Sequence, residues 1–206
     1  MMRLPLLFLF VCLFIPFTKA QWEHEFGSWS SVQVSHNTPH RWLLGGRIEH
    51  RRRDALKELD LGFARAMVGR SITSWLSFEL AADHMWRTSN NQNRMLLSLS
   101  AKGGWGPVRW TLRQRYIYAH NCALESHNDL MRTMLMISYP IPHSRITPYA
   151  MGEGYYWDDW QMTHLFGGCK WAVDNRSTID IFCVCNLKSS THTAIYSIGI
   201  GYNLAI

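Results

Sequence analysis

The stretch Trp110-Thr-Leu-Arg-Gln-Arg-Tyr116 alternates between apolar and polar residues along most of its length. Because successive side chains of a β-strand point to opposite faces, Trp110, Leu112 and Tyr116 share one apolar face. Arg113 and Arg115 lie on the opposite, charged face. The same two-residue alternation recurs almost to the last residue of the chain. Many strands of this kind are typical of a closed barrel in a membrane, with lipid outside and a polar lumen inside.

Eleven stretches of the chain follow the strand pattern, and short breaks rich in Pro, Gly, Asn and Asp separate them. Bacterial single-chain barrels have an even number of strands and keep both termini in the periplasm. The sequence therefore predicts an all-β, antiparallel, up-and-down transmembrane barrel of ten to twelve strands. It has ten if residues 27–36 do not form a full strand, and twelve if residues 22–26 add another. The stretches are 28–36, 40–50, 55–68, 73–85, 92–102, 107–119, 129–139, 145–157, 161–173, 177–187 and 191–205.

The orientation of the barrel follows from counting the breaks back from a periplasmic C-terminus. The short breaks at 69–72, 103–106, 140–145 and 174–176 then lie in the periplasm. The longest break, residues 120–128, falls on the outside, where longer loops are expected.

Residues 1–20 have the features of a cleaved signal peptide. Arg3 provides the positive start, an apolar run follows from residue 4 to 17, and Thr18-Lys19-Ala20 is a small-residue cleavage site. The run is shorter than the roughly 20 residues of a spanning helix. We therefore expect export, a single barrel domain over residues 21–206, and insertion into the outer-membrane bilayer by the barrel-assembly machinery.

The charge of the chain does not indicate a nucleic-acid partner. The formal net charge is +6, and two of the basic residues, Arg3 and Lys19, belong to the signal peptide. Only Arg51-Arg52-Arg53 forms a basic run, which we interpret as a solvated turn. Nucleic-acid binding needs a clustered basic face, and the remaining Arg residues are spread along strands beside Glu and Asp.

Four cysteines remain after the signal peptide, and no disulfide is expected between them. Cys183 and Cys185 lie on the same face of one strand, and Cys169 opposes Ile181 across the predicted hairpin. On the alternation these three point toward lipid, where Cys acts as a small hydrophobe.

The polar faces of the strands carry the candidate functional residues of the lumen. A barrel of about ten strands is narrow enough for side chains to fill, so charges inside it are expected to pair. We expect Arg132 and Glu153 to be close or to be bridged by Arg113 or Arg115. Leu61, Phe63, Leu97 and Ile137 are assigned to the lipid face. The lumen candidates are Arg47, Glu49, Glu79, Asp83, Arg113, Arg115, Arg132, Glu153, Lys170 and Asp180.

Catalytic and metal-binding motifs are absent from the sequence. His84 points away from Asp83 and Glu79 on the same predicted strand, so these residues cannot form a proton relay within it. His120, Cys122 and His127 share one break and are interpreted as a solvated loop. No cofactor and no metal ion are expected.

Five motifs spread over the chain carry a family resemblance. They are Trp29 soon after the signal peptide, Arg113-Gln-Arg115, Asp129-Leu-Met-Arg-Thr-Met134, Pro148–Tyr155 with Glu153, and a closing segment with His192 and Gly199-Ile-Gly-Tyr202. With these motifs the sequence resembles a family of small outer-membrane β-barrels of Gram-negative bacteria that is known only as domain of unknown function 2490. The resemblance implies an outer-membrane barrel and implies no activity. Ile206 departs from the aromatic residue with which many such barrels end.

Three functions are compatible with the sequence. The first is a non-catalytic outer-membrane barrel, with its charges forming either a structural ion-pair ladder or a narrow solute path lined by Arg. The second is a barrel enzyme that modifies lipids. The third is a soluble, lipocalin-like periplasmic barrel, which would reverse the pattern and place apolar residues inside and charges outside.

Overall fold

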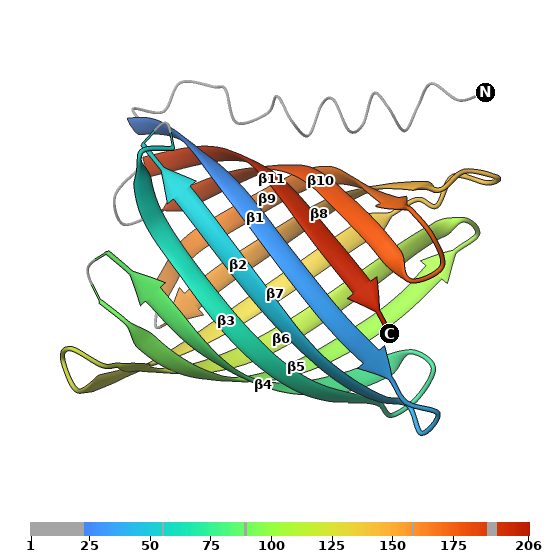
Figure 1. Cartoon of the computed structure of the whole chain (residues 1–206), viewed down its shortest axis with the longest axis horizontal. Coiled ribbons are helices and arrows are strands. Elements are labelled where there is room, and N and C mark those ends of the chain that lie inside the picture. The colour runs from blue at the N-terminus through green and yellow to red at the C-terminus, as the bar shows by residue number, and fades with distance from the viewer. Residues whose placement is uncertain (1–22, 55, 89, 158, 189–192) are drawn as a thin grey trace.

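The structure is a computed structural model that describes residues 23–54, 56–88, 90–157, 159–188 and 193–206. These residues form eleven strands that close into one barrel (Figure 1). No helix among them is long and apolar enough to cross a membrane. The strands are β1 (Glu23–Asn37), β2 (Trp42–Arg53), β3 (Glu58–Ser71), β4 (Leu76–Arg87), β5 (Gln92–Trp105), β6 (Val108–Asn121), β7 (Ser126–Ser138), β8 (Ile146–Trp157), β9 (Asp159–Ala172), β10 (Ser177–Lys188) and β11 (Thr193–Ala205).

The all-β barrel predicted from the sequence is confirmed, but its even number of strands is wrong. Every pair of consecutive strands is antiparallel, and β1 closes the barrel by pairing in parallel with β11, from Glu23↔Thr193 to Ser35↔Ala205. The other edge of β1 pairs with β2. Residues 23–26 and 27–36 are therefore parts of one continuous strand. Its two edges are both hydrogen-bonded, so no twelfth strand is needed to close the sheet.

An odd number of strands places the two ends of the described chain at opposite rims of the barrel. Because β1 and β11 run in the same direction, Glu23 lies at the rim where β11 begins. Ile206 lies at the other rim, as Figure 1 shows. The predicted signal peptide, residues 1–20, falls outside the described residues.

The break at 120–128 is not the long loop that the sequence indicated. The pairing of β6 and β7 continues through His120↔His127 and Asn121↔Ser126, so only residues 122–125 form the turn. The connection over residues 139–145 is longer and lies at the opposite rim. At that rim, Asp174 accepts hydrogen bonds from the backbone N–H groups of Arg176 and Ser177, both at 2.7 Å. These bonds favour the charged carboxylate and hold the pKa of Asp174 below its ordinary value.

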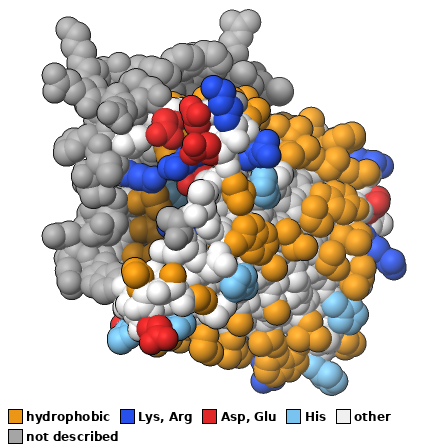
Figure 2. Space-filling model, turned by 60° about the vertical axis from the view of Figure 1, so that its left-hand side comes forward, with side chains coloured by type: hydrophobic (Ala, Val, Ile, Leu, Met, Phe, Trp, Pro, Cys, Tyr) orange, Lys and Arg blue, Asp and Glu red, His pale blue; other side chains and the backbone are white. Residues whose placement is uncertain are grey.

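The outer wall of the barrel is apolar. Leu97 is 51% exposed and Ile137 is 46% exposed, as expected for the outward face. Figure 2 shows hydrophobic side chains over much of the visible wall, with histidines among them. This is the reverse of the pattern that a soluble, lipocalin-like barrel requires.

The outward assignment of Leu61 and Phe63 is wrong, because both side chains are buried inside the barrel, at 6% and 5% exposure. On β3 the outward positions are taken by small residues such as Ala64 and Ala66, which are exposed. An apolar side chain does not by itself mark the outer wall of this barrel. The interior of this barrel is packed, so apolar residues occur on both faces of β3.

Apolar clusters fill much of the barrel interior between the charged groups. Trp29, Tyr149, Phe182 and Val184 form one cluster, in which the ring of Phe182 lies over Gly199. A second cluster contains Met67, Ala81, Leu96 and Ile117. The interior is therefore a packed core as well as a polar lumen. All four described cysteines are free.

Candidate functional site

Glu153 of β8 is the centre of one charged cluster inside the barrel. Its carboxylate accepts hydrogen bonds from Arg132 of β7 and from Arg113 of β6, the latter at 3.2 Å. His164 Nδ1 of β9 lies 3.5 Å from Glu153 Oε2. Arg113 reaches over the intervening strand β7, which is possible only on the concave side of the sheet. The Glu153 side chain is only 1% exposed.

Glu49 of β2 is the centre of a second charged cluster. Arg47 and Arg51 contact its two carboxylate oxygens at 2.5 and 2.6 Å. The indole N–H of Trp29 also donates to Glu49, and the guanidinium carbon of Arg51 lies 3.4 Å from the centroid of the Trp29 ring. The interpretation of residues 51–53 as a solvated turn is therefore wrong. The three residues end strand β2, and Arg51 points inward.

Asp83 of β4 holds a third cluster of the same kind. Arg65 of β3 and Arg94 of β5 contact its two carboxylate oxygens at 2.6 and 2.7 Å. On the next strand, β6, Arg115 pairs with Glu79 of β4 at 2.8 Å and donates to Ser98 Oγ of β5 at 2.7 Å. Asp83 and Arg115 are both buried.

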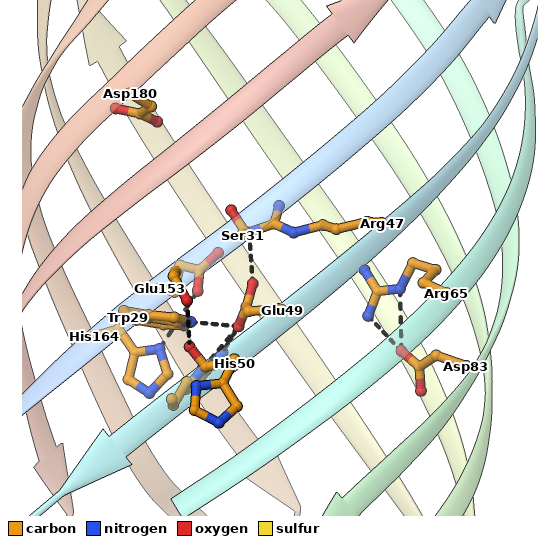
Figure 3. Close-up of polar contacts among 12 residues, drawn as sticks. Trp29, Ser31, Arg47, Glu49, His50, Arg65, Asp83, Glu153, His164 and Asp180 are labelled. Carbon is orange, nitrogen blue, oxygen red and sulfur yellow. Dashed lines mark hydrogen bonds and ion pairs between the residues drawn. The ribbon is translucent and has the colours of Figure 1, made fainter. Parts of the chain in front are cut away.

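Aromatic rings connect the Glu49 and Glu153 clusters across the barrel. The Trp29 and His164 rings meet edge to face with their centroids 5.8 Å apart. The Tyr155 ring lies beside both His164 and Arg132. Figure 3 shows Trp29 and His164 beside the two carboxylates, and Arg65 with Asp83 to one side. Charged and aromatic side chains from β1, β2, β8 and β9 therefore bridge the interior.

The last two predicted residues, Lys170 and Asp180, are register partners on β9 and β10. The Tyr149 hydroxyl donates to Asp180 at 3.0 Å, and Lys170 Nζ lies 5.1 Å from the centroid of the Tyr149 ring. In Figure 3 Asp180 stands apart from the other carboxylates. Tyr149 is thus the common contact of this pair.

Basic groups outnumber carboxylates in the interior clusters. Glu49, Asp83 and Glu153 each contact two Arg side chains. Each of these clusters therefore carries a net positive charge. Guanidinium groups present several N–H donors in a fixed plane, which suits them to carboxylate and phosphate groups.

The β4 residues that were considered for a proton relay lie on two different faces of their strand. His84 is exposed on the outer wall, whereas Asp83 and Glu79 point inward, so the three residues do not converge. Among the residues that the structure describes, no three His, Cys, Asp or Glu side chains gather as a metal site.

Sequence reasoning missed several members of the clusters, among them Trp29, Arg51, Arg65 and His164. Arg65 was not predicted because the inward and outward faces of β3 were assigned the wrong way round. Arg51 was not predicted because it lies in a run of three Arg residues. The alternation of Arg47, Glu49 and Arg51 at every second residue of β2 is a signal that could have identified Arg51.

The fold defines the chain as a closed, eleven-stranded β-barrel with an apolar outer wall. It resembles the structures titled "KdgM porin in complex with disordered oligogalacturonate" and "NanC porin structure in rhombohedral crystal form", each with a TM-score of 0.52 and 12% identity. The first match covers 79% of this chain and 91% of the other chain, and the second covers 78% and 85%. At this identity the likeness concerns the fold alone.

The chain belongs to the family DUF2490, described as a protein of unknown function, whose model matches residues 26–195. The resemblance stated from the sequence motifs is thereby confirmed. No curated protein matches the chain.

Proposed function

We propose that this protein is a non-catalytic outer-membrane barrel that works as a narrow, porin-like channel for small anions. The observation that carries the proposal is the ratio of two Arg side chains to one carboxylate around Glu49, Asp83 and Glu153. A confined path lined by excess guanidinium groups attracts anions and repels cations. The KdgM porin, which shares the fold, is named in complex with oligogalacturonate, a polyanion.

The location and assembly of the protein are part of the same proposal. The apolar wall fits a lipid bilayer, and the residues 1–20 fit a cleaved export signal. Insertion would then depend on the barrel-assembly machinery. Loops at both rims are short in the described structure, so the wall and the interior carry most of the chemistry.

A purely structural barrel is the second candidate, and the burial of the charged clusters favours it. Glu49 and Glu153 are each 2% exposed, and Arg115 is 2% exposed. Side chains therefore fill the middle of the barrel in this conformation. Passage of a solute would require Arg side chains to move aside, whereas a structural ladder would keep them in place.

Conductance in planar bilayers tests the proposal. We expect the purified barrel to conduct and to show a reversal potential of anion-selective sign in a KCl gradient. Arg47→Gln should lower the anion preference, because Arg47 contacts the inward-pointing Glu49 and its own side chain is 33% exposed. Arg53→Gln is the matched control, since Arg53 pairs with Glu58 at an exposed site. A folded protein with no conductance would refute the channel and leave the structural barrel.

A further inference from the structure

The outer wall of the barrel carries a groove of about 910 Å³ that the proposed channel does not use. It crosses the wall from β1 to β6. Its floor consists of the smallest side chains on this part of the wall, Gly46, Ala64, Ala66 and Ala82. The three Ala residues are exposed. We name this feature the wall groove.

Two adjacent rows of register partners build the wall groove. In the first row, Val34 pairs with Gly46, Gly46 with Ala66, Ala66 with Ala82, and Ala82 with Met95. Large side chains thus stand at both ends of a run of three small ones. Neighbouring strands lie about 4.8 Å apart, so the three small residues form a trough about 10 Å long between Val34 and Met95.

The second row changes from apolar to polar along its length. It begins at Val32 and Ile48 and ends at His84, Asn93 and His120, again as successive register partners. Asn93 is the second residue of β5, and His120 is the penultimate residue of β6. The polar end of the groove is therefore at the rim that carries the 122–125 turn. The apolar end extends down the wall.

The polar end is an ordered group of side chains. His84 Nδ1 donates to Asn93 Oδ1 at 2.7 Å, and Asn93 Nδ2 donates to Cys122 Sγ at 3.5 Å. The His84 ring also stacks on Trp86, with the centroids 6.3 Å apart. These contacts fix the His84 imidazole so that its Nε2 side faces away from Asn93. Figure 2 shows histidine side chains lying within the hydrophobic wall.

We propose that the wall groove binds one phospholipid, with an acyl chain along the small residues and the phosphate at His84 and His120. The inference rests on the membrane location proposed above. The charged residues that also border the groove turn their side chains to the interior ion pairs; they are Arg47, Arg65, Asp83 and Arg94. The outward side chains are therefore apolar along the trough and polar at the rim, which matches an amphiphile lying along the wall. Small side chains let an acyl chain approach the backbone closely, which increases dispersion contacts. In the imidazolium form both ring nitrogens carry a proton, so His84 can donate from Nδ1 to Asn93 and from Nε2 to a phosphate oxygen at the same time.

Native mass spectrometry of the detergent-purified barrel, with phosphatidylglycerol added, tests this site. Wild type should retain one phospholipid. Ala66→Leu and Ala82→Leu fill the trough and should lose it, and His84→Phe should weaken its retention. Ala150→Leu is the matched control, because Ala150 lies on β8, outside the groove, and its alternation places it on the outer wall. A shift in electrophoretic mobility on heating checks that each variant is folded. If the wild type lacked this shift, the result would contradict the proposed membrane barrel and not the lipid site.

Three outcomes would overturn the lipid site. The first is equal retention of phospholipid by wild type, Ala66→Leu and Ala82→Leu. The second is a change from dimer to monomer in the groove variants, which would assign the groove to a second copy of the chain. The third is retention of lipopolysaccharide but not of phosphatidylglycerol by the wild type.

Discussion

Replacing Glu153 by Gln should destabilise the barrel, because this carboxylate is shared by two Arg side chains in the interior. The substitution preserves the size of the side chain but leaves Arg113 and Arg132 without their shared carboxylate. Breaking a buried ion pair costs about 3–5 kcal/mol when the remaining charge is dry. The two Arg side chains keep 25% and 15% exposure, so water partly solvates them, and we expect about 3 kcal/mol.

The structure predicts an asymmetry between the partners of this cluster. Arg132→Met leaves Glu153 with Arg113 at 3.2 Å and His164 at 3.5 Å, so it should cost only about 1–2 kcal/mol. The double variant Arg132→Met/Glu153→Gln should be less stable than wild type but more stable than Glu153→Gln alone. One unpaired guanidinium, that of Arg113, remains in it.

Urea unfolding of the barrel in phospholipid vesicles measures these free energies. Glu58→Gln is the control, because the Glu58–Arg53 pair is exposed and should contribute less than about 1 kcal/mol. Equal destabilisation by Glu153→Gln and Glu58→Gln would refute the argument that the cluster is confined. So would a cost of Arg132→Met as large as that of Glu153→Gln.

Four further predictions concern the rims, the two faces and the closure of the barrel. With Ile206 at the periplasmic rim, a protease site inserted at Leu124 should be cleaved on intact cells and one at Trp105 should not; the reverse pattern would place Glu23 rather than Ile206 at the periplasmic rim. Leu97→Arg should lower the free energy of unfolding in vesicles by about 2–4 kcal/mol, whereas Leu97→Ala should have a mild effect. Leu96→Ala should lower it by about 2–5 kcal/mol, because Leu96 is packed inside the barrel. Equal effects of the two Ala variants would show that the faces are misassigned. Gly199→Ala should slow or prevent folding, because a Cβ would lie 2.2 Å from the Phe182 ring. At Gly152 an added Cβ would make only an ordinary contact, 3.9 Å from Leu165 Cδ2, so Gly152→Ala should fold normally. Asp174 has a lowered pKa in the folded protein, so its contribution to stability is present above its unfolded pKa and is lost as the pH falls through its folded pKa. The difference in stability between wild type and Asp174→Ala should therefore shrink in acid. A difference that does not depend on pH would contradict the role of the Asp174 hydrogen bonds.

The number of strands shows where reasoning from the sequence reached its limit. The alternation located all eleven strands within a few residues, and an even barrel left the first predicted stretch, residues 28–36, without a place. No local pattern specifies whether the last pair of strands is parallel or antiparallel, because both arrangements satisfy the same alternation. The parallel register of β1 on β11 depends on how the whole sheet curves and closes.

The faces of β3 show a second limit. Leu61 and Phe63 have the same side-chain character as the lipid-facing Leu97, and only their packing against Met85 inside the barrel distinguishes them. Arg65 shares their face, and it approaches Asp83 because β3 and β4 are in register there. In a narrow barrel, apolar side chains are stable on either face, so hydrophobicity alone does not assign a strand.

The sequence by itself determined the strands, the turns and the pairing of opposite charges along alternating faces, since these follow from the two-residue period of an extended chain. Only the tertiary structure decided which charges meet. Arg113 reaches Glu153 over an intervening strand, and Trp29 of β1 meets His164 of β9 across the interior. Such contacts require the sheet to close on itself, because closure brings the inner faces of distant strands within the length of a side chain.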